Sequence, residues 1–131
     1  GLLYGLFAGI LLDLFYSGPF GFYTLLFINN PGCHACEEGI EALKQAPAIN
    51  NEFAAGNLKI LAVYPDEDKE EWERHLPDFP KEWINGYDKK LVIKEKNLYD
   101  LKAIPTLYLL DKDKKVLLKD ATVAQIDQYL Q

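Results

Sequence analysis

Short apolar runs alternate with charged segments along most of this chain. The run Tyr23–Ile28 is rich in aromatic and β-branched residues, which predicts a buried β-strand. Similar apolar runs at 58–64, 107–110 and 116–118 predict three further strands. The polar segment 111–115 has the length and composition of a loop joining the last two strands as a hairpin.

The segments between these strands have helical spacing. Cys36, Ile40 and Leu43 form a core-facing stripe in a predicted helix over 36–46, which Pro47 ends or kinks. Further helices are predicted at 48–55, 67–76 and 121–131, an irregular segment at 83–88, a minor strand at 91–93, and a short helix or turn at 97–102. The order β-α-β-α-β-β-α predicts an α/β fold with a mixed central sheet and helices on both faces.

The first 22 residues are unusually apolar, with Asp13 as the one charged residue before Glu37. Asp13 and the helix-breaking segment Ser17–Gly21 interrupt the run, and neither half reaches the roughly 20 residues that a membrane span needs. We expect 1–22 to be an N-terminal extension that forms an edge element beside 23–29, with membrane contact or an irregular segment as the alternatives. The whole chain, 1–131, is then one domain with its core at 23–131.

Composition narrows the classes of function. The chain of 131 residues carries a formal net charge of −6, which argues against nucleic-acid binding. It begins with Gly1 and contains no methionine, so we expect any targeting segment of the precursor to lie outside this chain.

The two cysteines stand at a C-x-x-C spacing, as Cys33 and Cys36, directly after the first strand. Asn30-Pro31-Gly32 is a turn sequence, and the predicted helix begins just beyond it. The first sulfur therefore lies near the unpaired N–H groups of a helix start, which favour the nucleophilic thiolate. This pattern predicts a dithiol redox site, and a structural disulfide is the alternative.

His34 lies between the cysteines. When protonated it would stabilise a neighbouring thiolate and make the pair more oxidising; the alternative is an exposed residue that only tunes the potential. A zinc site needs about four ligands, but His34 lies inside the cysteine pair and His75 has no suitable spacing, so we expect no metal. No glycine loop for phosphate and no Ser-His-Asp set is found, and no bound cofactor is expected.

A strand, Cys33-His34-Ala35-Cys36, a helix, and then Ile104-Pro105-Thr106 before a hairpin and a terminal helix resemble the thioredoxin superfamily. More narrowly, this arrangement is similar to the TlpA/ResA-like thiol–disulfide oxidoreductases of bacterial cell envelopes, including thioredoxin-like proteins of Bacteroidetes. The resemblance covers about 23–131. It implies a thioredoxin-like fold and a periplasmic or cell-envelope location.

By resemblance, Cys33 is the attacking cysteine and Cys36 the resolving one. Pro105 matches the family's cis-proline, which faces the disulfide, and Ile104 the residue whose backbone pairs with the substrate. The implied activity is disulfide exchange with protein thiols and disulfides, as a reductase recharged by a membrane redox partner. The alternative is a non-catalytic binding module with a structural Cys33–Cys36 disulfide. A peroxidase of related fold is disfavoured, since its usual threonine and proline motif before the cysteine is missing.

Two positions depart from the family pattern. Gly32 stands where many relatives carry tryptophan, and Phe27 stands where thioredoxin has a buried acid that accepts a proton. Glu37, Glu38 and water are the remaining candidates for deprotonating Cys36.

Overall fold

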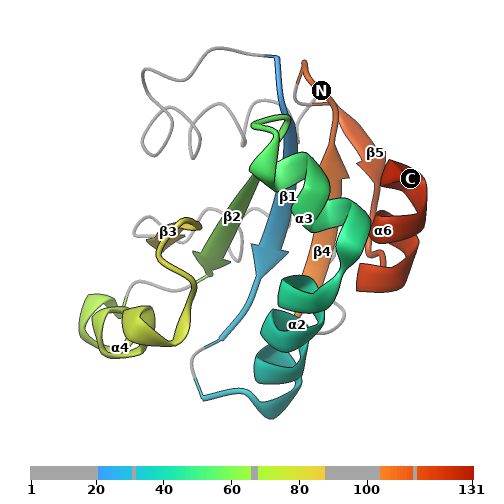
Figure 1. The fold of residues 1–131 in the computed structure, drawn as a ribbon. Coiled ribbons are helices and arrows are strands. Elements are labelled where there is room, and N and C mark those ends of the chain that lie inside the picture. The colour runs from blue at the N-terminus through green and yellow to red at the C-terminus, as the bar shows by residue number, and fades with distance from the viewer. Residues whose placement is uncertain (1–20, 31, 66–67, 88–103, 114) are drawn as a thin grey trace.

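The computed structural model describes residues 21–30, 32–65, 68–87, 104–113 and 115–131. In this part of the chain, five strands form one sheet in the order β3-β2-β1-β4-β5 (Figure 1). The strands are β1 (Tyr23–Ile28), β2 (Leu58–Tyr64), β3 (Ile84–Tyr87), β4 (Thr106–Leu110) and β5 (Val116–Leu118). β1, β2 and β3 run parallel, whereas β4 and β5 are antiparallel to their neighbours. The predicted mixed sheet and the hairpin are confirmed.

Strand β3 corrects the prediction that 83–88 is irregular. Its four residues pair in parallel with Leu61–Tyr64 of β2. Asn85 and Gly86 are poor strand formers, so the sequence gives no alternating signal there. Backbone pairing with β2 makes this segment a strand in spite of its composition.

The described helices are α2 (His34–Gln45), α3 (Pro47–Ala54), α4 (Lys69–His75) and α6 (Val123–Leu130), with a 3₁₀ turn, η1 (Leu76–Asp78), after α4. Pro47 occupies the first turn of α3, where its missing N–H costs no hydrogen bond. Gly56, with φ of +82°, follows the end of α3. The predicted helices near 36–46, 48–55, 67–76 and 121–131 are therefore confirmed, with small shifts of their ends.

Helices α2, α3 and α6 cover one face of the sheet (Figure 1). Leu25 and Phe27 of β1 pack there in a buried cluster that includes Leu43, Ile49 and Ile126 from the three helices. The opposite face presents side chains that are also almost completely buried: Leu26, Ile28, Leu61, Val63, Tyr108 and Leu110. Together these observations confirm the α/β class.

Some predictions fall outside the described residues. These are the edge element within 1–20, the minor strand at 91–93, the short helix or turn at 97–102, and the expected helical cover of the second face. Within the described ranges, no helix has the length and apolar character needed to cross a membrane.

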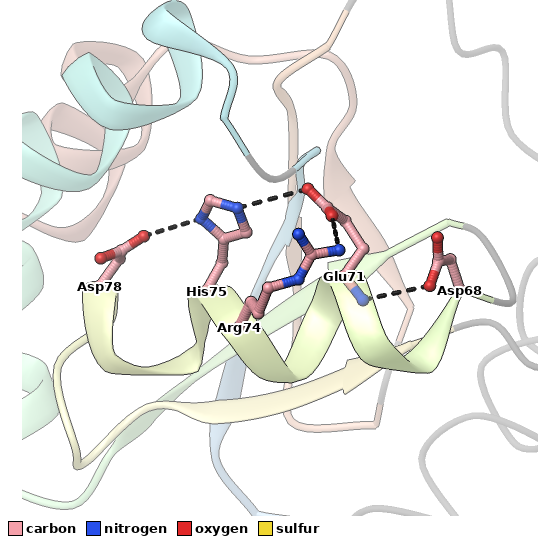
Figure 2. A network of polar contacts seen from close by, with 5 residues as sticks. All are labelled: Asp68, Glu71, Arg74, His75 and Asp78. Carbon is pink, nitrogen blue, oxygen red and sulfur yellow. Dashed lines mark hydrogen bonds and ion pairs between the residues drawn. The ribbon is translucent and has the colours of Figure 1, made fainter.

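Helix α4 lies beside β3 and carries a local network of polar contacts. Figure 2 shows His75 between two carboxylates, with Nδ1 3.0 Å from Asp78 Oδ2 and Nε2 3.3 Å from Glu71 Oε1. Glu71 also pairs with Arg74, and its backbone N–H is capped by the Asp68 side chain at 3.1 Å. These contacts all join residues within 68–78, so they stabilise the helix itself, while Trp72 packs against Tyr87 of β3 with ring centroids 4.8 Å apart.

Candidate active site

Cys33 lies where the chain passes from the carboxyl end of β1 into α2. It is the N-cap residue of α2, and its Sγ accepts a hydrogen bond from the Cys36 N–H at 3.2 Å. Gly32, just before it, has a φ of +72°, a left-handed conformation that suits glycine. A negative charge on this sulfur therefore faces the N–H groups of the first helical turn, as predicted from the turn and the spacing.

Cys36 is in a different environment, one turn along the same helix. Its side chain belongs to the buried core and the residue is 3% exposed, whereas Cys33 is partly exposed. Burial, as the largest cause, and a hydrogen bond with Cys33 raise the pKa of the Cys36 thiol to about 12. A hydrogen bond with the Asn30 backbone acts in the opposite direction, while negative charge on Cys33 and Glu37 adds to the increase in pKa. The pair thus consists of one accessible sulfur and one shielded thiol that stays protonated at neutral pH.

His34 turns toward acidic side chains of its own helix. Its Nε2 lies 2.9 Å from Glu38 Oε1 and its Nδ1 lies 4.0 Å from Glu37 Oε2. All three side chains are largely exposed. The carboxylates offset the positive charge that a protonated His34 would bring to the cysteines, and its tuning role stays a prediction.

Ile104 and Pro105 precede β4 at the same edge of the sheet. The Ile104–Pro105 peptide bond is cis, as the family resemblance implies. Thr106, the next residue, pairs with Ile28 at the end of β1, the point from which the cysteine loop departs. Pro105 also approaches α2, since a Cβ at Gly39 would lie 3.8 Å from Pro105 Cγ. The fold therefore brings Pro105 to the helix that carries both cysteines, and substrate binding by Ile104 and Pro105 stays a prediction.

Comparison with known proteins identifies the family to which this chain belongs. A family sequence model described as thioredoxin-like matches residues 21–116, which is more than half of the chain. The chain belongs to the thioredoxin-like family. No curated protein matches the sequence.

Three solved structures extend the comparison. A thioredoxin-like protein from Bacteroides caccae is 63% identical, with a TM-score of 0.81, over 88% of this chain and 41% of that one. The C-terminal domain of an uncharacterized protein from Bacteroides fragilis is 67% identical, also with a TM-score of 0.81, over 88% of this chain and 81% of that one. The thioredoxin domain of a thiol–disulfide oxidoreductase from Bacteroides vulgatus is 20% identical, with a TM-score of 0.68, over 86% of this chain and 81% of that one. This last likeness concerns the fold alone.

Phe27 marks the main chemical difference between this thioredoxin-like site and thioredoxin itself. Its ring is completely buried and packs edge-on against Trp83, with ring centroids 6.3 Å apart. On α2, a Cβ at Gly39 would come within 3.2 Å of the Phe27 ring, so glycine permits this close approach. The position of the buried acid is thus filled by an apolar ring, and the buried surroundings of Cys36 lack that proton acceptor.

The sequence pattern does not identify Asn29 as a structural or functional residue. It is 3% exposed, and its Nδ2 donates to the carbonyl oxygens of Phe27 and Val63 at 3.2 and 3.4 Å. Its backbone N–H also donates to the Val63 carbonyl at 3.0 Å. A polar residue directly after an apolar strand was the available signal, but its burial depends on β2, which lies far along the chain.

A small hollow beside Asn29 offers little room for a ligand. It is lined by Asn29, Ala62, Tyr64, Trp72, His75, Phe79 and Asn85, and its volume of about 10 Å³ suits no more than about one water molecule. Among the residues that the structure describes, no group of three or more His, Cys, Asp or Glu side chains is arranged to hold a metal ion.

Proposed function

We propose that this protein is a thiol–disulfide oxidoreductase that exchanges disulfides with protein substrates through Cys33 and Cys36. The observation that carries the proposal is the asymmetry of the pair. Cys33 is partly exposed at the start of α2, while Cys36 is buried with its pKa raised to about 12. Disulfide exchange requires such a division, because one sulfur meets the substrate and the other waits for the mixed disulfide.

The reaction has two steps. The Cys33 thiolate attacks a substrate disulfide, which forms a mixed disulfide and releases one substrate sulfur as a thiolate. Cys36 then loses its proton and attacks the Cys33 sulfur, so that the second substrate sulfur leaves and a Cys33–Cys36 disulfide forms. Two electrons pass from the dithiol to the substrate, and the proton from Cys36 reaches a leaving thiolate through solvent or through a nearby carboxylate such as Glu37.

Other residues take supporting roles in this proposal. Ile104 presents its backbone to the substrate chain, Pro105 faces the disulfide, and His34 tunes the potential of the pair. The cis bond before Pro105 and its closeness to α2 support these assignments. The division into an extension at 1–22 and a thioredoxin core at 23–131 is part of the same proposal.

The proposed setting is the bacterial cell envelope, with the protein acting as a reductase that a membrane redox partner recharges. The similarity to TlpA/ResA-like proteins supports this setting. The chain spans 41% of the length of its Bacteroides caccae relative, so the activity and partners of the whole protein belong to the proposal as well.

A trapping experiment tests the function. The Cys36→Ser variant is expected to accumulate mixed disulfides between Cys33 and client proteins, because the second step has lost its nucleophile. The readout is the set of adducts on non-reducing gels that dithiothreitol releases. The matched control, Cys33→Ser, is expected to capture none. A folded Cys36→Ser variant that forms no adduct, even with a reactive aromatic disulfide, contradicts the catalytic proposal.

The reduction potential tests the direction of electron flow. For a reductase we expect a value near that of thioredoxin, about −270 mV, measured against glutathione or dithiothreitol buffers. A value near about −120 mV contradicts the reductase assignment and indicates an oxidant. A value well below about −300 mV, without a reactive thiolate, supports the binding module with a structural disulfide instead.

A further inference from the structure

Gly39 lies where α2 meets the sheet, one helical turn after Cys36. It is half-buried in the interior of the helix, where glycine is less favourable than alanine. A Cβ at this position would lie 3.2 Å from Phe27 Cε1 and 3.3 Å from Phe27 Cζ, which is closer than side chains normally pack. The bare backbone of α2 therefore rests directly on the Phe27 ring.

The Phe27 ring has little freedom to move away from α2. It is completely buried, and its centroid lies 6.3 Å from that of Trp83, which in turn lies 6.2 Å from that of Phe79. Because protein interiors are closely packed, a ring supported from behind in this way resists displacement. A methyl group on residue 39 would therefore push α2 away from the sheet by a few tenths of an ångström.

Pro105 lies on the other side of the same contact. A Cβ at Gly39 would lie 3.8 Å from Pro105 Cγ, and α2 lies beside the start of β4 (Figure 1). Cys36, three residues before Gly39, is on the same face of α2 and belongs to the buried cluster against which Cys33 and Ile104 pack. The spacing between the cysteine helix and the segment with Ile104 and Pro105 is thus determined at Gly39.

We propose that Gly39 is a positioning residue for protein substrates: its missing side chain keeps α2 close to Pro105, so that a chain bound at Ile104 and Pro105 presents its disulfide to Cys33. The inference rests on the proposed function, because it requires substrate binding by these two residues. The cysteines share the first turn of α2, so a shift of the whole helix leaves their own geometry unchanged. Gly39 therefore acts on the alignment of the substrate chain.

Two probes separate this role from the exchange chemistry. Both carry a cysteine sulfur joined to the coloured aromatic thiol thionitrobenzoate; one is N-acetylcysteine amide, the other a short peptide rich in threonine and valine. The Cys33 thiolate attacks the cysteine sulfur of either probe, and thionitrobenzoate leaves as the more acidic thiol. Cys36 then gives its proton to solvent, attacks the Cys33 sulfur and releases the cysteine or peptide thiolate. The rate of colour release measures the attack by Cys33.

Wild type is expected to attack the peptide probe at least about tenfold faster than the small probe, because contacts with the chain orient its disulfide. Gly39→Ala should lose most of this preference and keep the rate with the small probe within about twofold of wild type, since small misplacements of reacting groups cost large factors in rate. The matched control is Gln45→Ala, an exposed position on α2, which should change neither rate by more than about twofold.

A rescue variant tests the cause of the loss. Phe27→Leu removes Cε1 and Cζ, the two ring atoms that would crowd the new methyl group. The double variant Phe27→Leu/Gly39→Ala is therefore expected to regain the peptide preference, although loss of the buried ring lowers its melting temperature. A rate that recovers while stability falls is not the behaviour of a residue that is only structural.

The remaining outcomes overturn definite statements. Gly39 is only structural if Gly39→Ala keeps the full peptide preference or slows both probes equally. If that variant does not fold, the double variant is compared with Phe27→Leu, and a lower peptide preference in the double variant overturns the proposal. Equal rates of wild type with both probes remove the substrate contact at Ile104 and Pro105, and the role of Gly39 with it, but leave the exchange chemistry intact. A wild type that reacts with neither probe overturns the proposed function itself.

Discussion

Reduced protein treated with iodoacetamide at pH 7 is expected to be alkylated at Cys33 and to remain unmodified at Cys36. The thiolate is the reacting species, and with a pKa of about 12 roughly one Cys36 side chain in 10⁵ is ionised at this pH. Cys36 is also 3% exposed, which denies access to the reagent. Together these factors should make alkylation of Cys33 at least about 100-fold faster.

Peptide mass spectrometry after timed quenching measures both rates in one sample. Protein unfolded in guanidinium is the control, and there the two cysteines should react at similar rates. Comparable labelling of both cysteines in the folded protein would show that Cys36 is neither buried nor protonated as described. It would remove the asymmetry on which the proposed function depends.

The sequence predicted the part of the site that local pattern determines. The apolar run ending at Ile28, the turn at Asn30-Pro31-Gly32 and the helical stripe of Cys36 and Ile40 are all local signals, so the strand, turn and helix around the cysteines were expected. The same stripe predicts that Cys36 faces the core, which the structure confirms.

Features that depend on distant partners were not predicted. β3 forms because Ile84–Tyr87 pairs with β2, and its own residues carry no strand pattern. Asn29 is buried because Val63, which lies 34 residues later, accepts its hydrogen bond. The pairing of His34 with Glu38 follows helical i, i+4 spacing, so the sequence carries a local signal for it.

Phe27 and Asn30 together account for the unusual environment of Cys36. A buried acid would accept the proton of the resolving thiol, but an aromatic ring excludes water and raises the cost of charge. The compensating contact comes from the backbone of Asn30, which the turn after β1 supplies.

Burial of the Cys36 thiol also predicts how stability depends on pH. The folded pKa of about 12 lies above the unfolded value of 9.0, so between these values the folded protein retains a proton that the unfolded chain has released. The contribution of the protonated Cys36 thiol to the free energy of unfolding is therefore fully present below about pH 9, and it is lost as the pH rises toward 12. We expect reduced wild type to lose about 1.4 kcal/mol more than Cys36→Ala between about pH 8 and 10.

Urea unfolding of both reduced proteins at several pH values measures this difference. The variant is the necessary control, because lysine and tyrosine side chains titrate in the same range and contribute equally to both curves. The oxidised protein should behave like Cys36→Ala, since the disulfide removes the titrating thiol. Parallel curves for reduced wild type and variant would mean that Cys36 ionises as easily in the folded protein as in the unfolded chain. In that case the shielding of the resolving thiol would be wrong.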